Sequence, residues 1–236
     1  MRVVGDSHFF VGLDLGQVQD FTAVAVVERA ELVGEWDPVM TGFRRYAELR
    51  TRFLERMELG TPYPEVVRRV GEITRSADLR GRCHLAVDST GVGRPVVDML
   101  RRAGLGCIMM PVTITWGSSA SRMADGQYHV PKRDLITGVQ ILLQSGGLRI
   151  ARSLKHGPAL AAEMAEMRVK ITAAGNTQFG SWREGSHDDL VLALALACWS
   201  ARQVYPNGPY GEEGHWQRKD QGEWEKGFRE WARERG

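Results

Sequence analysis

The run LVLALALACW, residues 190–199, is the part of the sequence that most limits how this chain can fold. Leu and Ala favour a helix, and a helix that is apolar on every side belongs in the interior of a protein. The run is too short to cross a membrane, which takes about 20 apolar residues. We therefore predict a helix from residue 187 to about 202, packed deeply against a sheet with its first turn emerging at the sheet's edge.

Polar residues stand directly before this run. Ser186 and Asp189 have the spacing of a capping box, and His187 and Asp188 lie between them. Acidic residues in a first helical turn are stabilised by the helix dipole by ~0.3 to 1 kcal/mol, so both aspartates have a purely structural explanation as caps. They also have a functional one, as part of a site at the mouth of the helix.

The rest of the chain alternates between patterns typical of strands and helices, which predicts an α/β protein. Strands are expected at residues 9–16, 21–29, 38–46, 83–88 and 106–114, and a hairpin within 167–182. Helices are expected within residues 60–80, 95–103, 131–145 and 155–167. Composition changes near Pro206, so we predict one domain over residues 1–205 and a charged, Gly- and Trp-containing tail over 206–236.

Composition excludes several classes of protein. An apolar content of 43% supplies a large core, and a net charge of +2 means that any surface for nucleic acid must be local. Three cysteines without CxxC spacing indicate neither a zinc site nor a disulfide framework. With no leader pattern and no membrane span, we expect a soluble intracellular protein.

Two further aspartates change the interpretation of the polar turn before the helix. Asp14 lies in the apolar strand FVGLDLG, and Asp88 ends the strand CHLAVD. If these strands are neighbours, both carboxylates lie at one edge of the sheet, and the turn at His187 adds a third. Carboxylates held close together repel one another, and a bound Mg²⁺ or Mn²⁺ ion commonly neutralises this repulsion. Two ions ~3.5 to 4 Å apart would suit phosphodiester hydrolysis, one activating water and one stabilising the departing oxygen.

Taken together, the segments VGLDLGQVQDFTAVAVVE, HLAVDSTGVGRPVVDML and HDDLVLALALA resemble, in that order and spacing, the nuclease domain of the large terminase subunit of tailed bacteriophages. The likeness extends over about residues 8–202. It implies an RNase H-like fold, a central mixed β-sheet flanked by helices on both faces, and an acidic cluster that binds two metal ions. It further implies an endonuclease that cleaves concatemeric viral DNA during genome packaging.

The resemblance also implies site residues, partners and a location. Asp14 and Asp88 match metal ligands of the family, and the third ligand falls in HDD. Adjacent helical residues point about 100° apart, so Asp188 and Asp189 cannot both face one ion equally well, and Asp189 is the preferred choice. His187 would assist, and Asp20 would support the site unless it is an ordinary turn residue. Double-stranded DNA, a packaging ATPase, a portal and a small terminase subunit are the implied partners, in the cytoplasm of an infected bacterium.

Four basic residues are candidate phosphate contacts, because the resemblance implies a DNA path beside the corresponding helix and hairpin. The ones proposed on this ground are Lys132, Arg133, Arg168 and Lys170. A solvated surface is the alternative explanation for them. In the tail, Trp224, Phe228 and Trp231 share one face of a short helical pattern, which suits either docking or local packing.

The chain departs from the family in one respect. Large terminase subunits usually carry an ATPase motor, yet this sequence has no GxxxxGK[ST] phosphate loop. Three alternatives account for this departure: an excised domain, a separately encoded nuclease subunit, or a relative used for something other than packaging. Three other functions stay open: a Holliday-junction resolvase with similar carboxylates, a catalytically silent DNA-binding or scaffold subunit, and, less well supported, an actin-like ATPase or sugar kinase.

Overall fold

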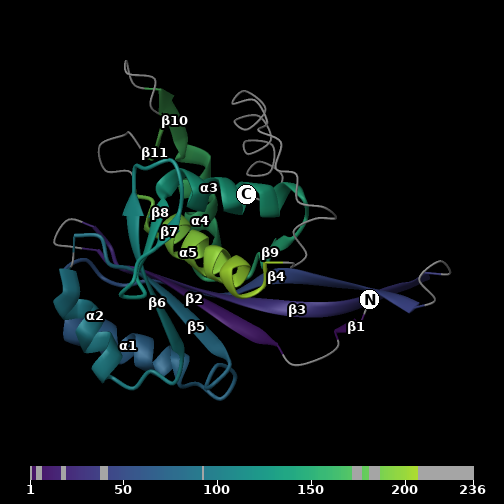
Figure 1. Cartoon of the computed structure of the whole chain (residues 1–236), viewed down its shortest axis with the longest axis horizontal. Coiled ribbons are helices and arrows are strands. Elements are labelled where there is room, and N and C mark those ends of the chain that lie inside the picture. The colour runs from purple at the N-terminus through teal and green to yellow at the C-terminus, as the bar shows by residue number, and fades with distance from the viewer. Residues whose placement is uncertain are drawn as a thin grey trace.

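The structure is a computed structural model of the chain, and it describes residues 2–3, 7–16, 20–37, 42–91, 93–171, 177–180 and 187–206. The predicted tail falls almost wholly outside these residues. The described part forms a sheet with helices on both of its faces (Figure 1). None of the helices in this part is long and apolar enough to span a bilayer.

Nine of the described strands belong to one mixed sheet with the order β7-β8-β6-β5-β2-β3-β4-β9, and β1 pairs with β3. Their bounds are β1 Arg2–Val3, β2 His8–Asp14, β3 Ala23–Asp37, β4 Gly42–Arg56, β5 Cys83–Asp88, β6 Ile108–Thr115, β7 Ser121–Arg122, β8 Tyr128–Pro131 and β9 Leu148–Ile150. Strand β3 is antiparallel to its neighbours β2 and β4, whereas β2, β5, β6 and β8 run parallel. A separate hairpin joins β10 (Arg168–Ile171) to β11 (Thr177–Gly180).

Five helices of the described part cover the sheet. Helices α1 (Tyr63–Thr74) and α2 (Gly93–Arg102) lie on one face, whereas α3 (Lys132–Gln144), α4 (Gly157–Glu166) and α5 (Asp189–Val204) lie on the other. Each face has its own hydrophobic core. The predicted α/β fold, with a mixed sheet between two layers of helices, is therefore confirmed.

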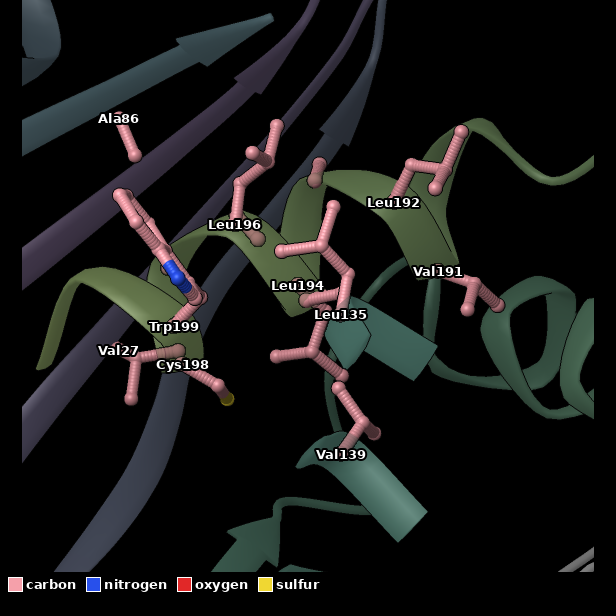
Figure 2. Packing of buried hydrophobic residues seen from close by; sticks show 14 of the residues in the cluster. Val27, Ala86, Leu135, Val139, Val191, Leu192, Leu194, Leu196, Cys198 and Trp199 are labelled. Atoms are coloured by element: carbon pink, nitrogen blue, oxygen red, sulfur yellow. The ribbon is translucent and has the colours of Figure 1, made fainter. Parts of the chain in front are cut away.

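Helix α5 is the buried centre of the second layer, as its sequence predicts. Every residue from Asp189 to Ala201 is buried, because the helix contacts β2 and β3 on one side and α3 and α4 on the other. Figure 2 shows side chains of α5, such as Leu194, packed close to Leu135 of α3. Gly12 permits the closest approach to the sheet, since a Cβ there would lie 1.8 Å from the carbonyl oxygen of Ala193.

The structure differs from the sequence-based expectation mainly at the edge of the sheet. The strand expected at residues 38–46 is β4, which continues to Arg56, and β7, β8 and β9 were not expected. Helix α5 begins at Asp189 rather than residue 187, and its N-cap Asp188 makes no capping hydrogen bond through its side chain. The predicted helices and the hairpin of β10 and β11 are otherwise present.

Candidate active site

The alternation of side chains along two neighbouring strands places Asp14 and Asp88 on the face of the sheet that α5 covers. Phe10 and Ala86 belong to the core on that face, and each aspartate follows at an even interval on its own strand. Strands β2 and β5 are parallel, with Leu13 paired to Val87. The next residue of each strand is the aspartate, so the two carboxylates are neighbours at the carboxyl ends of the strands. Both residues are buried.

The first turn of α5 brings two more carboxylates to this edge. Asp189 is 4% exposed and lies close enough to Asp14 for its charge to raise the pKa of Asp14. Asp188, one residue earlier, is half-buried and its Oδ2 accepts a hydrogen bond from Lys132 Nζ at 2.7 Å. The two adjacent aspartates therefore have different partners. Asp188 is neutralised by a lysine on α3, whereas Asp189 faces the interior of the site.

Burial and mutual repulsion raise the pKa values of this cluster. The pKa of Asp14 lies well above its ordinary value because the side chain is desolvated and because Asp88, Asp189 and Asp188 surround it. Burial likewise raises the pKa of Asp88, against a hydrogen bond that its Oδ1 accepts from the Thr90 N–H at 2.7 Å. Burial raises the pKa of Asp189 to about 6. The folded chain thus holds these groups where negative charge is unfavourable.

Two basic side chains offset part of this charge. Lys132 lowers the pKa values of Asp14 and Asp88 in addition to binding Asp188. Arg56 Nη2 contacts Glu163 Oε1 and lies 3.5 Å from Asp189 Oδ2. Within the part of the chain that the structure describes, four clustered aspartates and Glu163 thus face the two cations Arg56 and Lys132.

His187 and Asp20 lie at the border of the site. His187 Nδ1 is 3.9 Å from Asp189 Oδ2, and its ring meets that of Phe21 edge-on, with 4.8 Å between the ring centroids. Asp20 is exposed, and its charge contributes to the raised pKa of Asp189. Both residues are thus placed near the cluster.

The four basic residues proposed as DNA contacts have different surroundings. Lys132 is mostly buried and bound to Asp188. Arg133 is more exposed and donates from Nη2 to the Ser118 carbonyl at 3.0 Å. Arg168 and Lys170 lie on β10, and their side chains are outside the described structure.

Sequence reasoning missed Arg56, Glu163 and Thr90, all of which contact aspartates of the site or their partners. Arg56 lies on a part of β4 that was not expected to be a strand. Glu163 did leave a signal in the sequence, because it is a lone charge between Leu160 and Met164 on the buried side of α4. Thr90 lies in the turn STGVG and gave no comparable signal.

Oxygen donors of this kind suit a hard divalent cation such as Mg²⁺ or Mn²⁺. In the described residues, however, no group of three or more His, Cys, Asp or Glu side chains is already arranged to hold an ion. The donor chemistry and the raised pKa values fit such a cation, and in this structure Asp188 and Asp189 contact Lys132 and Arg56 instead.

Comparisons with known proteins support the fold. No family model matches the sequence, and no curated protein does so either. The structure resembles the crystal structure of the large terminase nuclease from thermophilic phage G20c, with 22% identity, a TM-score of 0.54, and coverage of 83% of this chain and 85% of that one. The nuclease domain of the bacteriophage SPP1 large terminase with bound Mn is 13% identical, with a TM-score of 0.47 and coverage of 82% and 86%. This chain therefore has the RNase H-like α/β fold that is found in the phage G20c large terminase nuclease.

Proposed function

We propose that this chain is an endonuclease that hydrolyses phosphodiester bonds of duplex DNA. The observation that carries the proposal is the meeting of Asp14, Asp88 and Asp189 at one edge of the sheet. These residues come from three distant segments, and burying them together is unfavourable for folding. A catalytic site explains that arrangement, whereas capping of α5 does not, since neither Asp14 nor Asp88 belongs to a helix.

The proposed cofactor is Mg²⁺ or Mn²⁺, with two ions as the expected number. Asp14, Asp88 and Asp189 would hold them, and Asp188 is the neighbour that Lys132 binds. When bound, such ions supply Lewis acidity and activate water for attack on phosphorus. The chain's own contribution is to hold the three carboxyl groups together in a desolvated position, with Asp88 oriented by the Thr90 N–H.

DNA would approach the edge of the sheet where β2 and β5 end. Of the two proposed basic residues whose side chains are described, Arg133 is the more exposed and therefore the more accessible to phosphates, whereas Lys132 is mostly buried against Asp188. Arg168 and Lys170 on the hairpin remain proposed contacts. The setting we propose is the cutting of concatemeric viral DNA in an infected bacterial cell, with a packaging ATPase, a portal and a small terminase subunit as partners.

The test is cleavage of supercoiled plasmid by the wild type and by Asp88→Asn, each with Mn²⁺, with Mg²⁺ and with EDTA. We expect wild-type cutting with either metal, none with EDTA, and a loss of at least about 100-fold in Asp88→Asn, because the site would lose a charged ligand. Asp98→Asn is the matched control, since Asp98 is a half-exposed aspartate on α2 that pairs with Arg101.

Circular dichroism would check that the variants are folded. Equal cutting by the wild type and Asp88→Asn would refute the assignment of Asp88. Cutting of a four-way junction in strong preference to linear duplex would instead favour a resolvase. No metal-dependent cutting by any folded protein, together with no Mn²⁺ binding, would favour the silent DNA-binding subunit.

A further inference from the structure

Arg56 and Glu163 form a buried ion pair directly behind the acidic cluster. Their side chains are 19% and 7% exposed, and Arg56 also lies 3.5 Å from Asp189 Oδ2. Arg56 is the last residue of β4 and Glu163 lies in α4, so the pair joins two elements that are distant in the sequence. Such a buried pair is weak evidence for stability by itself, because desolvation offsets much of the attraction between the charges.

Glu163 also binds the first turn of α5. Its Oε2 accepts a hydrogen bond from the Val191 N–H at 3.1 Å, and this N–H is one of the donors that a helix leaves without an internal partner at its start. The local N-cap, Asp188, makes no such bond through its side chain. One carboxylate therefore holds the guanidinium of Arg56 and the start of α5 in a fixed relation.

Asp189 depends on this arrangement. Its Oδ2 is buried and accepts no hydrogen bond in the described structure, so the charges of its neighbours determine its position. Arg56 is the cation nearest to Asp189 Oδ2, at 3.5 Å, and His187 Nδ1 lies 3.9 Å from the same oxygen. Because the guanidinium of Arg56 also pairs with Glu163, it attracts Asp189 less strongly than it would if Asp189 were its sole partner. A guanidinium bound to Asp189 alone would compete more strongly with a metal ion.

A bulge in β4 makes the contact possible. Phe53 pairs with Val26 and Thr51 with Val27, so the backbone of Arg52 has no pairing partner on β3, although its side chain binds Glu28 there. From this bulge onward the side chains of β4 alternate in the opposite sense. After the bulge, Glu55 faces Arg69 of α1, whereas Arg56 faces α5 and Glu163. Unbulged pairing would have placed Arg56 on the opposite face of the sheet.

We propose that Arg56 and Glu163 are positioning residues that hold Asp189 ready for the divalent cation, an inference that rests on the proposed function above. Glu163→Gln keeps the size of the side chain and removes the charge that shares Arg56. Mn²⁺ affinity measured by calorimetry should fall by about 10- to 100-fold, as for other groups that orient metal ligands. The Mn²⁺ concentration for half-maximal plasmid cutting should rise by a similar factor, with an unchanged KM for DNA.

The matched control is Glu55→Gln, since Glu55 precedes Arg56 on the same strand and pairs with Arg69 on the other face of the sheet. It should leave Mn²⁺ affinity unchanged. A double-mutant cycle between Arg56→Gln and Asp189→Asn, read as unfolding midpoints in EDTA, tests the contact without metal. We expect the two midpoint shifts to be non-additive.

The outcomes separate this inference from the proposed function. If the wild type cuts DNA but Glu163→Gln binds Mn²⁺ with unchanged affinity, the positioning role is overturned and the proposed function is not. Additive midpoint shifts for Arg56→Gln and Asp189→Asn, in a wild type that cuts DNA, would have the same meaning. A lower unfolding midpoint in Glu163→Gln with wild-type affinity would show that the pair only stabilises the fold. Absence of both Mn²⁺ binding and cutting in the wild type would refute the proposed function, and the positioning role with it.

Discussion

Asp189 is a side chain whose burial is unfavourable for stability but suits the proposed metal site. It is almost fully buried, and burial raises its pKa to about 6 although Arg56 and His187 act in the opposite direction. A neutral residue would suit that position in a protein selected for stability alone. The same holds for Asp14, whose pKa is raised by burial and by the other aspartates.

The raised pKa of Asp189 makes the stability of the metal-free protein depend on pH. Between its ordinary value of 3.8 and about 6, the folded state keeps a proton that the unfolded state has released. The free energy of unfolding should therefore fall as pH rises through this window, by up to about 3 kcal/mol from this group.

Urea unfolding in EDTA at pH 4 and at pH 7 would measure this effect. Asp189→Asn lacks the titrating group, so its stability relative to the wild type should increase from pH 4 to pH 7. Asp98→Asn, which changes an aspartate on α2 instead, should show no such trend. A constant difference between the wild type and Asp189→Asn at both pH values would contradict the expectation.

At the scale of elements, the contact between β2 and α5 is made by backbone atoms. Gly12 lies directly beneath Ala193 and Ala197, and the strand reaches Asp14 two residues later on the same face. The depth at which α5 packs on the sheet therefore also sets the height of its first turn above Asp14. A side chain at Gly12 would alter both the core and the site.

Gly12→Ala should lower the free energy of unfolding by about 1 to 3 kcal/mol or more, because the added methyl group meets the Ala193 carbonyl and has to push α5 outward. Chemical denaturation measures the loss. Gly138→Ala is the control, since Gly138 is within α3 and a Cβ there meets only the side chain of Arg202 at 3.6 Å. It should be neutral or stabilising by up to about 1 kcal/mol, and equal effects of the two changes would contradict the packing argument.

The sequence predicts those elements whose pattern is regular. The all-apolar run of α5 indicates a buried helix. The apolar segments that end at Asp14 and Asp88 likewise indicate buried strands and where each strand ends. Strand β4 was predicted only in part because the bulge at Arg52 breaks its alternation, and Arg56 was missed for this reason. The local pattern of α4 indicates that Glu163 is a buried charge, but its partners on β4 and α5 are distant in the sequence and no local pattern identifies them.

At the scale of the whole molecule, the proposed metal site would couple metal binding to folding. An ion that binds only the folded state stabilises it, by about 2.7 kcal/mol at 100 times the dissociation constant. For a domain of this size that corresponds to a rise in Tm of roughly 5 to 10 °C. We expect Mn²⁺ to raise the Tm of the wild type and of Asp98→Asn, and to leave Asp14→Asn nearly unchanged. A differential scanning experiment with Mn²⁺ and with EDTA measures this, and equal shifts in all three proteins would exclude Asp14 as a ligand.

The position of α5 also has a consequence in time. A chain emerging from the ribosome presents β2 and β5 well before Asp189, because both strands precede α5 in the sequence. The partly made protein therefore has two of the three aspartates but an incomplete cluster. Docking of α5 on Gly12 brings Asp189 to the other two aspartates, so we expect the proposed nuclease site to be incomplete, and the chain inactive on DNA, until this core is formed.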